Sequence, residues 1–323
     1  MVVLAGFEIP VPHWWVKPPA ALVPPVPRQL LDYEISRLGP HRILFSQGCF
    51  DVLLFTARDA PALLLEVGRL RELTFRGAGE GTGRSYDLDR FDERYEQLVL
   101  WDRNGGQVAG AYRITRVDPV AASRGALDLY TQTLFRLRPE FFLELGPSAE
   151  LGRSFVTPGY QRKPLSLLLL WRGIGAYLER YPQCQALFGA VSISRSYPAE
   201  IRQSLVAYFA SQAVDDPLRP HAQARRRLAA GGGVKAEAAT IEAIDRAARQ
   251  LGCDGAAGRG IPVLLRQYLK LGGRVIDCGI DPSFGGCLDS LIVVDFRLAG
   301  RDRLARLLNV RDKPAQTEAP VWT

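Results

Sequence analysis

The apolar residues of this chain follow two patterns, one with the spacing of an amphipathic helix and one with the short runs of a buried strand. The clearest helix is predicted from about Ala60 to Arg76, where Asp59 can cap the first turn and Pro61 suits it. Its apolar stripe consists of Leu63, Val67, Leu70 and Thr74. Four further helices are predicted at Pro164 to Glu179, Pro198 to Gln212, Ala236 to Leu251 and Pro262 to Leu271.

Strands are predicted between these helices. Gln97 to Asp102 and Gln107 to Ile114 flank a loop whose Asn104-Gly105 step favours a hairpin turn, so the two strands should pair antiparallel. The other strands are predicted within Phe141 to Val156 and at Ala186 to Ser194, Arg274 to Ile280 and Leu288 to Phe296. This order of elements predicts an α/β (α+β) fold in which helices flank a mixed sheet rather than a purely parallel one.

Composition divides the 323 residues into five segments. Residues 1–30 hold prolines around Trp14 and Trp15, which predicts an extended arm that packs on the body or, as the alternative, meets a lipid headgroup boundary. Residues 31–212 form the core, and residues 213–260 form a basic, glycine-rich insertion or lid with a helix. Three consecutive arginines in that insertion, at 225 to 227, are interpreted as solubility charge. Residues 261–310 complete the domain, and residues 311–323 form a flexible tail.

Charge and cysteine content narrow the class of protein. A formal net charge of +7 favours acidic partners, but the aromatic residues are not interleaved with arginines as in RNA-binding sheets, so nucleic acid is not expected. Scattered cysteines without a Cys-x-x-Cys pair argue against a metal site and indicate buried thiols. No apolar run approaches the roughly 20 residues of a bilayer span. A cytoplasmic protein is predicted, with peripheral contact at the inner membrane surface as a further option.

Charged residues inside apolar segments mark candidate chemistry. Arg71 lies among apolar side chains of the first predicted helix, and a cluster with Asp87, Asp89 and Asp92 follows a glycine-rich stretch. A buried guanidinium needs a carboxylate partner. The cluster therefore either pins its loop to the helix as a structural ion pair or contributes to a polar site.

The segment Glu150-Leu151-Gly152-Arg153-Ser154-Phe155-Val156 places two opposite charges in an otherwise apolar strand. Residues three apart in a regular strand face opposite sides, so Glu150 and Arg153 reach one site only if the strand bulges, and Gly152 is where a bulge fits. A bulge would free backbone N–H groups at about Ser154 to Val156 to hold an oxyanion. No Ser-His-Asp or Cys-His set lies nearby, so these residues allow direct attack by an amine while a carboxylate takes its proton.

The run Tyr160-Gln161-Arg162-Lys163 precedes the helix predicted from Pro164. Exposed N–H groups and the dipole at a helix N-terminus attract phosphate, and Arg162 and Lys163 would strengthen the attraction. The site suits the phosphate of a phosphopantetheine. The alternative is a solvated basic turn.

Together these segments resemble the hemolysin-like branch of the GCN5-related N-acyltransferases (GNAT), which includes the ornithine and glycine N-acyltransferases of bacterial aminolipid synthesis. The matching segments are Glu66 to Arg76, Gly79-Glu80-Gly81-Thr82-Gly83, Asp87 to Asp92, Glu150 to Val156, Val191 to Ser194, Gln267 to Leu271, Asp281-Pro282 and Asp289. They span about residues 30 to 298. Acyl-homoserine lactone synthases are more distantly similar, through Arg71-x-x-x-Phe75, Asp89-x-x-Asp92, Arg113 and Glu150-x-x-Arg153.

The resemblance implies a mostly antiparallel GNAT-like sheet with a C-terminal extension. It implies that Glu150 is the general base, directly or through water, and that Phe75 shapes the acyl or pantetheine channel. The polar lining of the acceptor site would be Arg71, Asp89, Asp92, Arg113 and Arg153. The implied donor is the phosphopantetheine thioester of an acyl-carrier protein, with no tightly bound cofactor.

One departure bears on the donor. Gln161 to Pro164 contains no glycine, so the glycine-rich pyrophosphate loop of coenzyme A-dependent relatives is absent, which weakens a coenzyme A interpretation. Related chains often act beside an O-acyltransferase, but the His-x-x-x-x-Asp motif of that enzyme is missing here. We therefore expect this chain to form only the amide bond, in cooperation with a separate O-acyltransferase.

The expected function is transfer of a long acyl chain to the amine of an ornithine-like or glycine-like amino acid, which gives a lyso-aminolipid. A coenzyme A-dependent transferase or a signal synthase on the same scaffold is the enzymatic alternative. A non-catalytic, membrane-associated binding module is the alternative from another class, suggested by the Pro-Trp arm and the positive charge.

Overall fold

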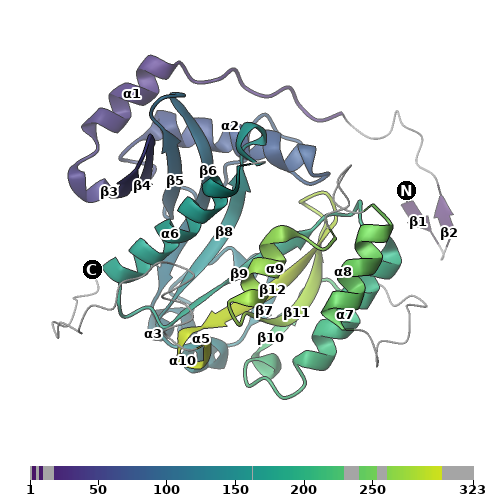
Figure 1. Ribbon diagram of the computed structural model, residues 1–323. Coiled ribbons are helices and arrows are strands. Elements are labelled where there is room, and N and C mark those ends of the chain that lie inside the picture. The colour runs from purple at the N-terminus through teal and green to yellow at the C-terminus, as the bar shows by residue number, and fades with distance from the viewer. Residues whose placement is uncertain are drawn as a thin grey trace.

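An eight-stranded mixed sheet runs through the middle of the molecule (Figure 1). This computed structural model describes residues 2–4, 7–9, 18–161, 163–228, 240–252 and 260–299. The strand order is β11-β12-β9-β8-β6-β5-β4-β3, and only the β8–β9 pair is parallel within that sheet. The bounds are β3 Ile43–Gln47, β4 Phe50–Phe55, β5 Glu96–Asp102, β6 Gln107–Val117, β8 Ser148–Val156, β9 Ala186–Ile193, β11 Arg274–Asp281 and β12 Cys287–Asp295. Two short antiparallel ribbons pair β1 Val2–Leu4 with β2 Phe7–Ile9, and β7 Phe135–Leu137 with β10 Ala222–Ala224.

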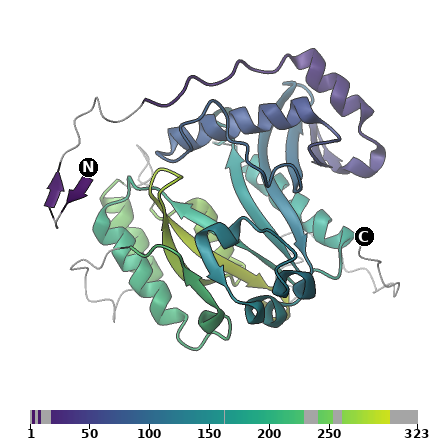
Figure 2. The ribbon, with the colours of Figure 1, turned by 180° about the vertical axis from the view of Figure 1, so that it is seen from behind.

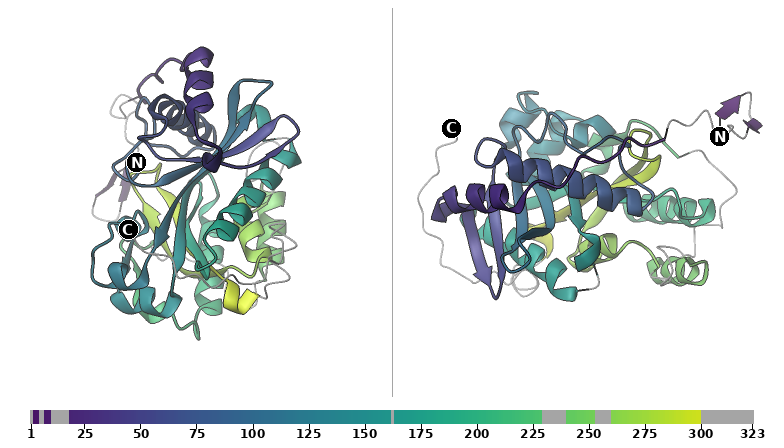
Figure 3. Two further views of the ribbon diagram at one scale, coloured as in Figure 1. Left: turned by 90° about the vertical axis from the view of Figure 1, so that its left-hand side faces the viewer. Right: turned by 90° about the horizontal axis from the view of Figure 1, so that it is seen from above.

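Helices cover both faces of the sheet (Figures 2 and 3). The face that we call the α6 face carries α6 Pro164–Arg180, α7 Ala199–Gln212, α8 Ile241–Gln250 and α9 Val263–Lys270. The opposite face, called the α2 face, carries α1 Arg28–Arg37, α2 Pro61–Gly77, α3 Pro119–Ser123, α4 Thr131–Leu134 and α5 Pro139–Leu145. Short helical segments lie at Pro40–Arg42, Pro158–Tyr160, Arg219–His221 and Phe296–Ala299. No helix in these described ranges is both long enough and apolar enough to cross a bilayer.

Burial on both faces explains the nearly continuous apolar runs of the central strands. In β12, for example, Leu288 and Ile292 pack into the core of the α6 face, whereas Leu291 and Val293 pack into a core of the α2 face. Each strand therefore divides its side chains between two cores, as the two-residue repeat of a strand requires.

The predicted mixed, mostly antiparallel sheet with flanking helices is confirmed. The helix predicted from Ala60 to Arg76 is α2, Pro61–Gly77, and the predicted hairpin is β5 and β6. Strand β8 lies within the predicted region Phe141 to Val156, although the first part of that region is the end of α5. Elements that the sequence pattern did not predict are β1, β2, α1, β3, β4, α3, α4, β7, α5, β10 and α10, which is Phe296–Ala299.

The predicted five-segment division of the chain stays a prediction. Strands β11 and β12 belong to the same sheet as the strands of residues 31–212. Trp14, Trp15, residues 229–239 of the predicted lid and the predicted tail at 311–323 lie outside the described residues. Residues 18–27 run alongside α2 (Figure 1), where Ala20 N donates to Gly83 O at 2.9 Å and Val23 N to Ser85 O at 3.1 Å.

The predicted bulge in β8 is present, one residue beyond the predicted position. Arg113 of β6 pairs with Gly152 and Ala111 pairs with Phe155, so Arg153 and Ser154 together oppose one residue of β6. Arg153 has a φ of 50°, a conformation that no other described residue except glycine adopts. This bulge turns the chain so that Glu150 and Arg153 both face the α2 side of the sheet.

Strands β8 and β9 pair only at their first residues and then separate. The parallel register covers Ser148–Glu150 against Ala186–Phe188 and stops there. Gly189 sits at the point of separation, and a Cβ on it would lie 2.0 Å from the carbonyl oxygen of Leu151. Beyond this contact, the edge of β8 from Leu151 to Val156 has no partner strand on the β9 side.

Candidate active site

A cavity of about 820 Å³ occupies the gap between the separating strands β8 and β9. Side chains from both faces of the sheet line it. On the α2 face these are Phe75, Glu80, Tyr130, Arg153, Ser192, Phe284 and Asp289. On the α6 face they are Tyr112, Ser154, Leu187, Val191, Leu264, Tyr268, Ile292 and Val294. The cavity is therefore charged on one face of the sheet and mainly apolar on the other.

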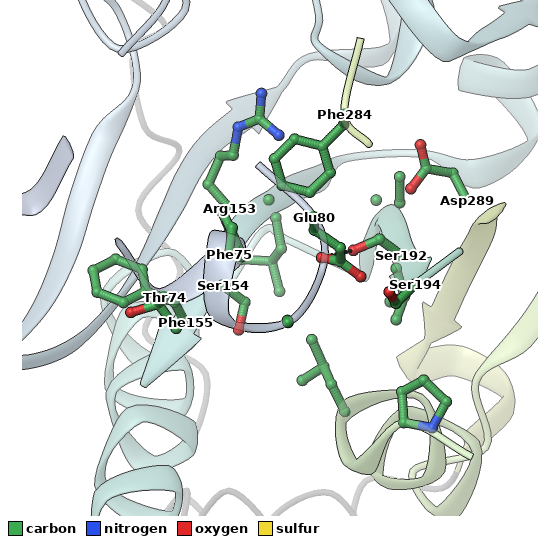
Figure 4. A pocket seen from close by; sticks show the side chains of 18 of the residues that line it. Thr74, Phe75, Glu80, Arg153, Ser154, Phe155, Ser192, Ser194, Phe284 and Asp289 are labelled. Atoms are coloured by element: carbon green, nitrogen blue, oxygen red, sulfur yellow. Dashed lines mark hydrogen bonds between the residues drawn. The ribbon is translucent and has the colours of Figure 1, made fainter. Parts of the chain in front are cut away.

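Charged groups meet at the α2 face of the cavity (Figure 4). Arg153 and Asp289 lie on either side of the Phe284 ring, and Glu80 lies near Asp289. Ser192 of β9 donates a hydrogen bond to Oε2 of Glu80 at 3.0 Å. Burial, together with the negative charges of Asp281 and Glu80, raises the pKa of Asp289 to about 8. A carboxyl group with this pKa changes its charge near neutral pH, so it can exchange a proton with a bound amine.

Aromatic rings frame the guanidinium of Arg153. Its Cζ lies 4.7 Å from the ring centroids of both Tyr130 and Phe284. Phe284 also packs edge-on against Phe75, with 4.9 Å between centroids, and Phe75 packs against Phe155. Phe75, predicted to shape the channel, therefore forms part of the cavity wall.

The structure brings five of the predicted polar residues into one buried group, which also includes Asp87. We call it the ionic cluster: Arg71, Asp87, Asp89, Asp92, Arg113 and Arg153. Asp92 Oδ2 lies 2.9 Å from Arg71 Nη2 and 3.1 Å from Arg113 Nη1, and Arg113 Nη1 lies 2.6 Å from Asp89 Oδ1. Arg153 Nε lies 3.3 Å from Asp87 Oδ2. Of this cluster, only Arg153 lines the cavity. The other members lie behind it, away from the cavity.

Opposite charges balance one another inside the ionic cluster. Burial would raise the pKa of Asp92, but Arg71 and Arg113 outweigh it and hold that pKa below its usual value. Burial would lower the pKa of Arg153, but Tyr130 and the three aspartates raise it. Asp92 is therefore charged at neutral pH, and the guanidinium of Arg153 is a fixed positive charge at the cavity.

Glu150 is fully engaged away from the cavity. Its Oε1 accepts hydrogen bonds from the N–H of Thr131, at 2.6 Å, and from the Thr131 hydroxyl, and its Oε2 accepts one from the Tyr95 hydroxyl. Its side chain is buried and is not part of the cavity lining. Burial raises the pKa of Glu150, whereas the hydrogen bonds from Thr131 and Tyr95 oppose the rise. The predicted role of Glu150 as general base stays a prediction.

The residues predicted for the oxyanion and the pantetheine lie in two places. Ser154, Phe155 and Val156 line the cavity along the open edge of β8. Lys163 is exposed and immediately precedes α6, with its Nζ 4.4 Å from the Tyr160 ring centroid. Arg162 lies outside the described residues. The start of α6 has no side-chain cap, although Pro164 carries no N–H and the N–H of Ser166 donates to the carbonyl oxygen of Lys163 at 3.1 Å.

Sequence reasoning did not assign a role to several residues of the cavity. These are Glu80, Tyr130, Ser192, Phe284 and Asp289. Asp289 carried the same signal as Glu150, because it is a lone charge inside the apolar run of β12. Tyr130 and Phe284 lie in loops and short helical turns, where no spacing rule links them to β8.

Known proteins match the chain over most of its length. A family model described as an acetyltransferase (GNAT) domain matches residues 70–172. A glycine N(alpha)-acyltransferase of Bacteroides thetaiotaomicron is 31% identical over 262 residues, which cover 78% of this chain and 74% of the relative. An L-ornithine N(alpha)-acyltransferase of Rhodobacter capsulatus is 30% identical over 232 residues, which cover 68% of this chain and 80% of the relative.

A solved structure of a CoA-dependent acyl-homoserine lactone synthase aligns with 84% of this chain and 94% of its own, at 11% identity and a TM-score of 0.40. The curated relatives agree with the family model that matches around α2, the ionic cluster and β8. The chain therefore belongs to the GNAT family and is an N-acyltransferase.

Proposed function

We propose that this enzyme transfers a long acyl group from an acyl-carrier-protein thioester to the amine of a glycine-like or ornithine-like amino acid, forming an N-acyl amino acid. The observation that carries the proposal is the cavity between β8 and β9, which is ionic on the α2 face and mainly apolar on the α6 face. An amino acid suits the ionic end, and an acyl chain suits the apolar end.

The acceptor would bind on the α2 face. Arg153 offers a guanidinium, which matches the geometry of a carboxylate. Asp87 and Asp89 of the ionic cluster, 3.3 Å and 3.7 Å from that guanidinium, hold it in place. Phe75 and Phe284 would exclude water around the amino acid and the reacting carbonyl.

The donor would bind on the α6 face. Leu187, Val191, Ile292 and Val294 offer an apolar wall to the acyl chain. The unpaired backbone edge of β8 at Ser154 to Val156 offers N–H donors to the thioester oxygen as it becomes an oxyanion. The start of α6, with Lys163 beside it, would hold the phosphate of the pantetheine arm.

Two surface features support the choice of partners. The net charge of +7 favours an acidic carrier protein over a neutral one. Leu165 and Leu168, 41% and 50% exposed, follow Lys163 at the start of α6 and support peripheral contact with a membrane. Such contact would deliver the N-acyl amino acid to a separate O-acyltransferase.

The experiment is mass spectrometry of reactions that contain the purified protein, glycine or L-ornithine, and either a long-chain acyl-carrier protein or the matching acyl-coenzyme A. We expect an N-acyl amino acid with the carrier protein, and its loss in the Arg153→Ala variant. If only acyl-coenzyme A gives the product, the donor is coenzyme A rather than the carrier protein. If neither donor gives an amide with any amino acid, the proposed acceptor class is wrong.

A further inference from the structure

Asp289 stands apart from the other buried carboxylates of the described chain. Its side chain is 4% exposed and lines the cavity. Its one hydrogen bond comes from the thiol of Cys287, at 3.7 Å to Oδ1, which is a weak donor. No ion pair joins Asp289 to any residue that the structure describes. A buried carboxylate without a cation is costly to ionise, so this position calls for a positive partner from outside the chain.

Most of the other buried acids in the described residues have an arginine partner, and Glu150 is held by Thr131 and Tyr95 instead. Asp92 contacts two arginines, Glu72 pairs with Arg76, and Asp295 pairs with Arg297. These carboxylates serve the fold, because their partners belong to the same chain. Asp289 differs from them because it lines the cavity and its hydrogen bond comes from a thiol, which leaves room for a positively charged ligand.

The opposite wall of the cavity holds the complementary charge. Arg153 is 10% exposed, and its Nε has no hydrogen-bond partner among the described residues although Asp87 lies 3.3 Å away. Figure 4 shows this guanidinium and the carboxylate of Asp289 on either side of Phe284, with Glu80 and Ser192 next to Asp289. An α-amino acid carries a carboxylate and an ammonium on one carbon, and so matches two opposite charges on the walls of one cavity.

We propose that Asp289 binds the ammonium group of the acceptor amino acid and takes its proton, while Arg153 holds the carboxylate of the acceptor. The inference rests on the proposed N-acyl transfer and adds the residue that activates the amine. Glu80, held by Ser192, adds a second negative charge beside the ammonium.

The proton and bond changes balance as follows. The ammonium gives one proton to the Asp289 carboxylate, and the free amine attacks the thioester carbonyl carbon to form the C–N bond. The C–S bond then breaks, the pantetheine thiolate leaves, and the remaining extra proton on nitrogen passes to that thiolate. Asp289 returns its proton to solvent, and no oxidant or other reactant is needed.

Glu150 takes a different role in this arrangement. It binds Thr131 and Tyr95, and the Tyr95 hydroxyl in turn accepts the N–H of Tyr130 at 3.0 Å. The Tyr130 ring lies against the guanidinium of Arg153. Glu150 is therefore a positioning residue, which holds Tyr130 and through it Arg153.

Asp289→Asn and Glu150→Gln separate the two roles. With Asp289→Asn we expect kcat at pH 7 to fall by roughly 10²–10⁴-fold and glycine or L-ornithine to bind more weakly in calorimetry without donor. Raising the pH to 9 should recover much of the kcat of Asp289→Asn, because more of the amine is then already deprotonated. Glu150→Gln should lose activity without recovery at high pH. Asp295→Asn, which changes a buried aspartate of the same strand outside the cavity, should keep wild-type kcat.

The charges that face Asp289 set the pH profile. The charged groups are Glu80, Asp281 and Arg153, and the titratable groups beside them are Cys287 and Tyr130. Glu80→Gln removes one negative neighbour and should move the rising limb of kcat to lower pH. If Asp289→Asn alters the fold, the pH shift in Glu80→Gln still tests the role of Asp289.

Three outcomes decide the inference. If Asp289→Asn makes the N-acyl amino acid at the wild-type rate and with the wild-type pH profile, Asp289 is not the base. If Glu150→Gln, and not Asp289→Asn, recovers at high pH, the base is Glu150. If the wild type makes no amide but loses amino-acid binding on Asp289→Asn, the proposed reaction fails and the ammonium site stands.

Discussion

At the scale of single residues, the ionic cluster shows how buried charges are made tolerable. Asp92 makes polar contacts with four neighbours. These are Arg71, Arg113, the side chain of Gln97 and the N–H of Asp89. Every charge in the cluster faces an opposite one, and Asp92 is the carboxylate that Arg71 and Arg113 share.

We predict that Asp92→Asn lowers the free energy of unfolding by about 3–5 kcal/mol, because two buried arginines then lose their shared carboxylate. Urea denaturation at pH 7 measures this. Asp128→Asn is the control, since Asp128 pairs with Arg90 and Arg94 at the exposed surface, and it should change stability much less. Because the pKa of Asp92 is lowered, its stabilising effect is present above about pH 4 and is lost as the pH falls through that lowered value.

Asp289 should affect stability with the opposite sign. Its pKa rises from 3.8 to about 8 on folding, so the folded state holds the proton more tightly and loses stability as the pH rises between these values. We predict that Asp289→Asn unfolds at a higher temperature than the wild type at pH 8.5 and that the difference shrinks at pH 5. Differential scanning calorimetry across this range tests it, and equal midpoints at pH 8.5 would contradict the predicted burial of a charge.

The site residues were only partly predictable from sequence for a physical reason. Arg71 and Arg153 stood out because each is a charge among apolar side chains, Asp92 because it belongs to a charged cluster, and Arg113 only through the family resemblance. Whether such a charge faces a cavity or another side chain depends on contacts between distant segments. Glu150 and Asp289 carry the same local signal, yet Glu150 binds Thr131 and Tyr95 while Asp289 faces the cavity.

At the scale of elements, the strongly periodic segments were predicted to within a residue or two, as α2, β5 and β9 show. The missed strands β3 and β4 form a hairpin through Gly48 and Cys49, a turn that lacks the Asn-Gly signal of the next hairpin. Helix α5 and strand β8 share one apolar stretch, and only Gly146-Pro147 separates them. Periodicity fails where an element is shorter than two turns or where apolar runs merge.

The separation of β8 and β9 depends on one glycine. We predict that Gly189→Ala destabilises the fold by about 1–3 kcal/mol, because the added methyl group would meet the backbone carbonyl of Leu151. Gly152→Ala is the matched control, since no atom lies within 4 Å of the position that its added methyl group would take and its backbone needs no positive φ. Chemical denaturation of both variants makes the comparison, and equal losses would show that the contact at Gly189 is unimportant.

At the scale of the whole molecule, residues 18–27 tie the loop that carries Glu80 and the aspartates of the ionic cluster to α2. Ala20 and Val23 donate to Gly83 and Ser85, Arg76 Nη1 donates to Ala20 O at 2.8 Å, and Val26 N donates to Glu66 Oε2 at 3.1 Å. This segment runs alongside α2 towards α1 (Figure 2).

We predict that deletion of residues 1–26 raises the KM for the amino acid and speeds hydrogen exchange at residues 79–92, because that loop loses its backbone partners. Hydrogen-exchange mass spectrometry and steady-state kinetics measure the two effects. Deletion of residues 1–17 is the control, since it leaves each of the contacts just described in place. Unchanged exchange in the longer deletion would show that the loop is held by α2 alone.

Because side chains of both faces of the sheet line the gap between β8 and β9, the two proposed substrates would bind there from opposite faces. Both substrates can then be bound at the same time. The described cavity residues include no histidine that could activate a serine to form a covalent acyl-enzyme. The enzyme should therefore work through a ternary complex. Initial rates measured at varied concentrations of both substrates should give intersecting double-reciprocal lines. Parallel lines would indicate that the acyl group is first transferred to the protein as a covalent intermediate.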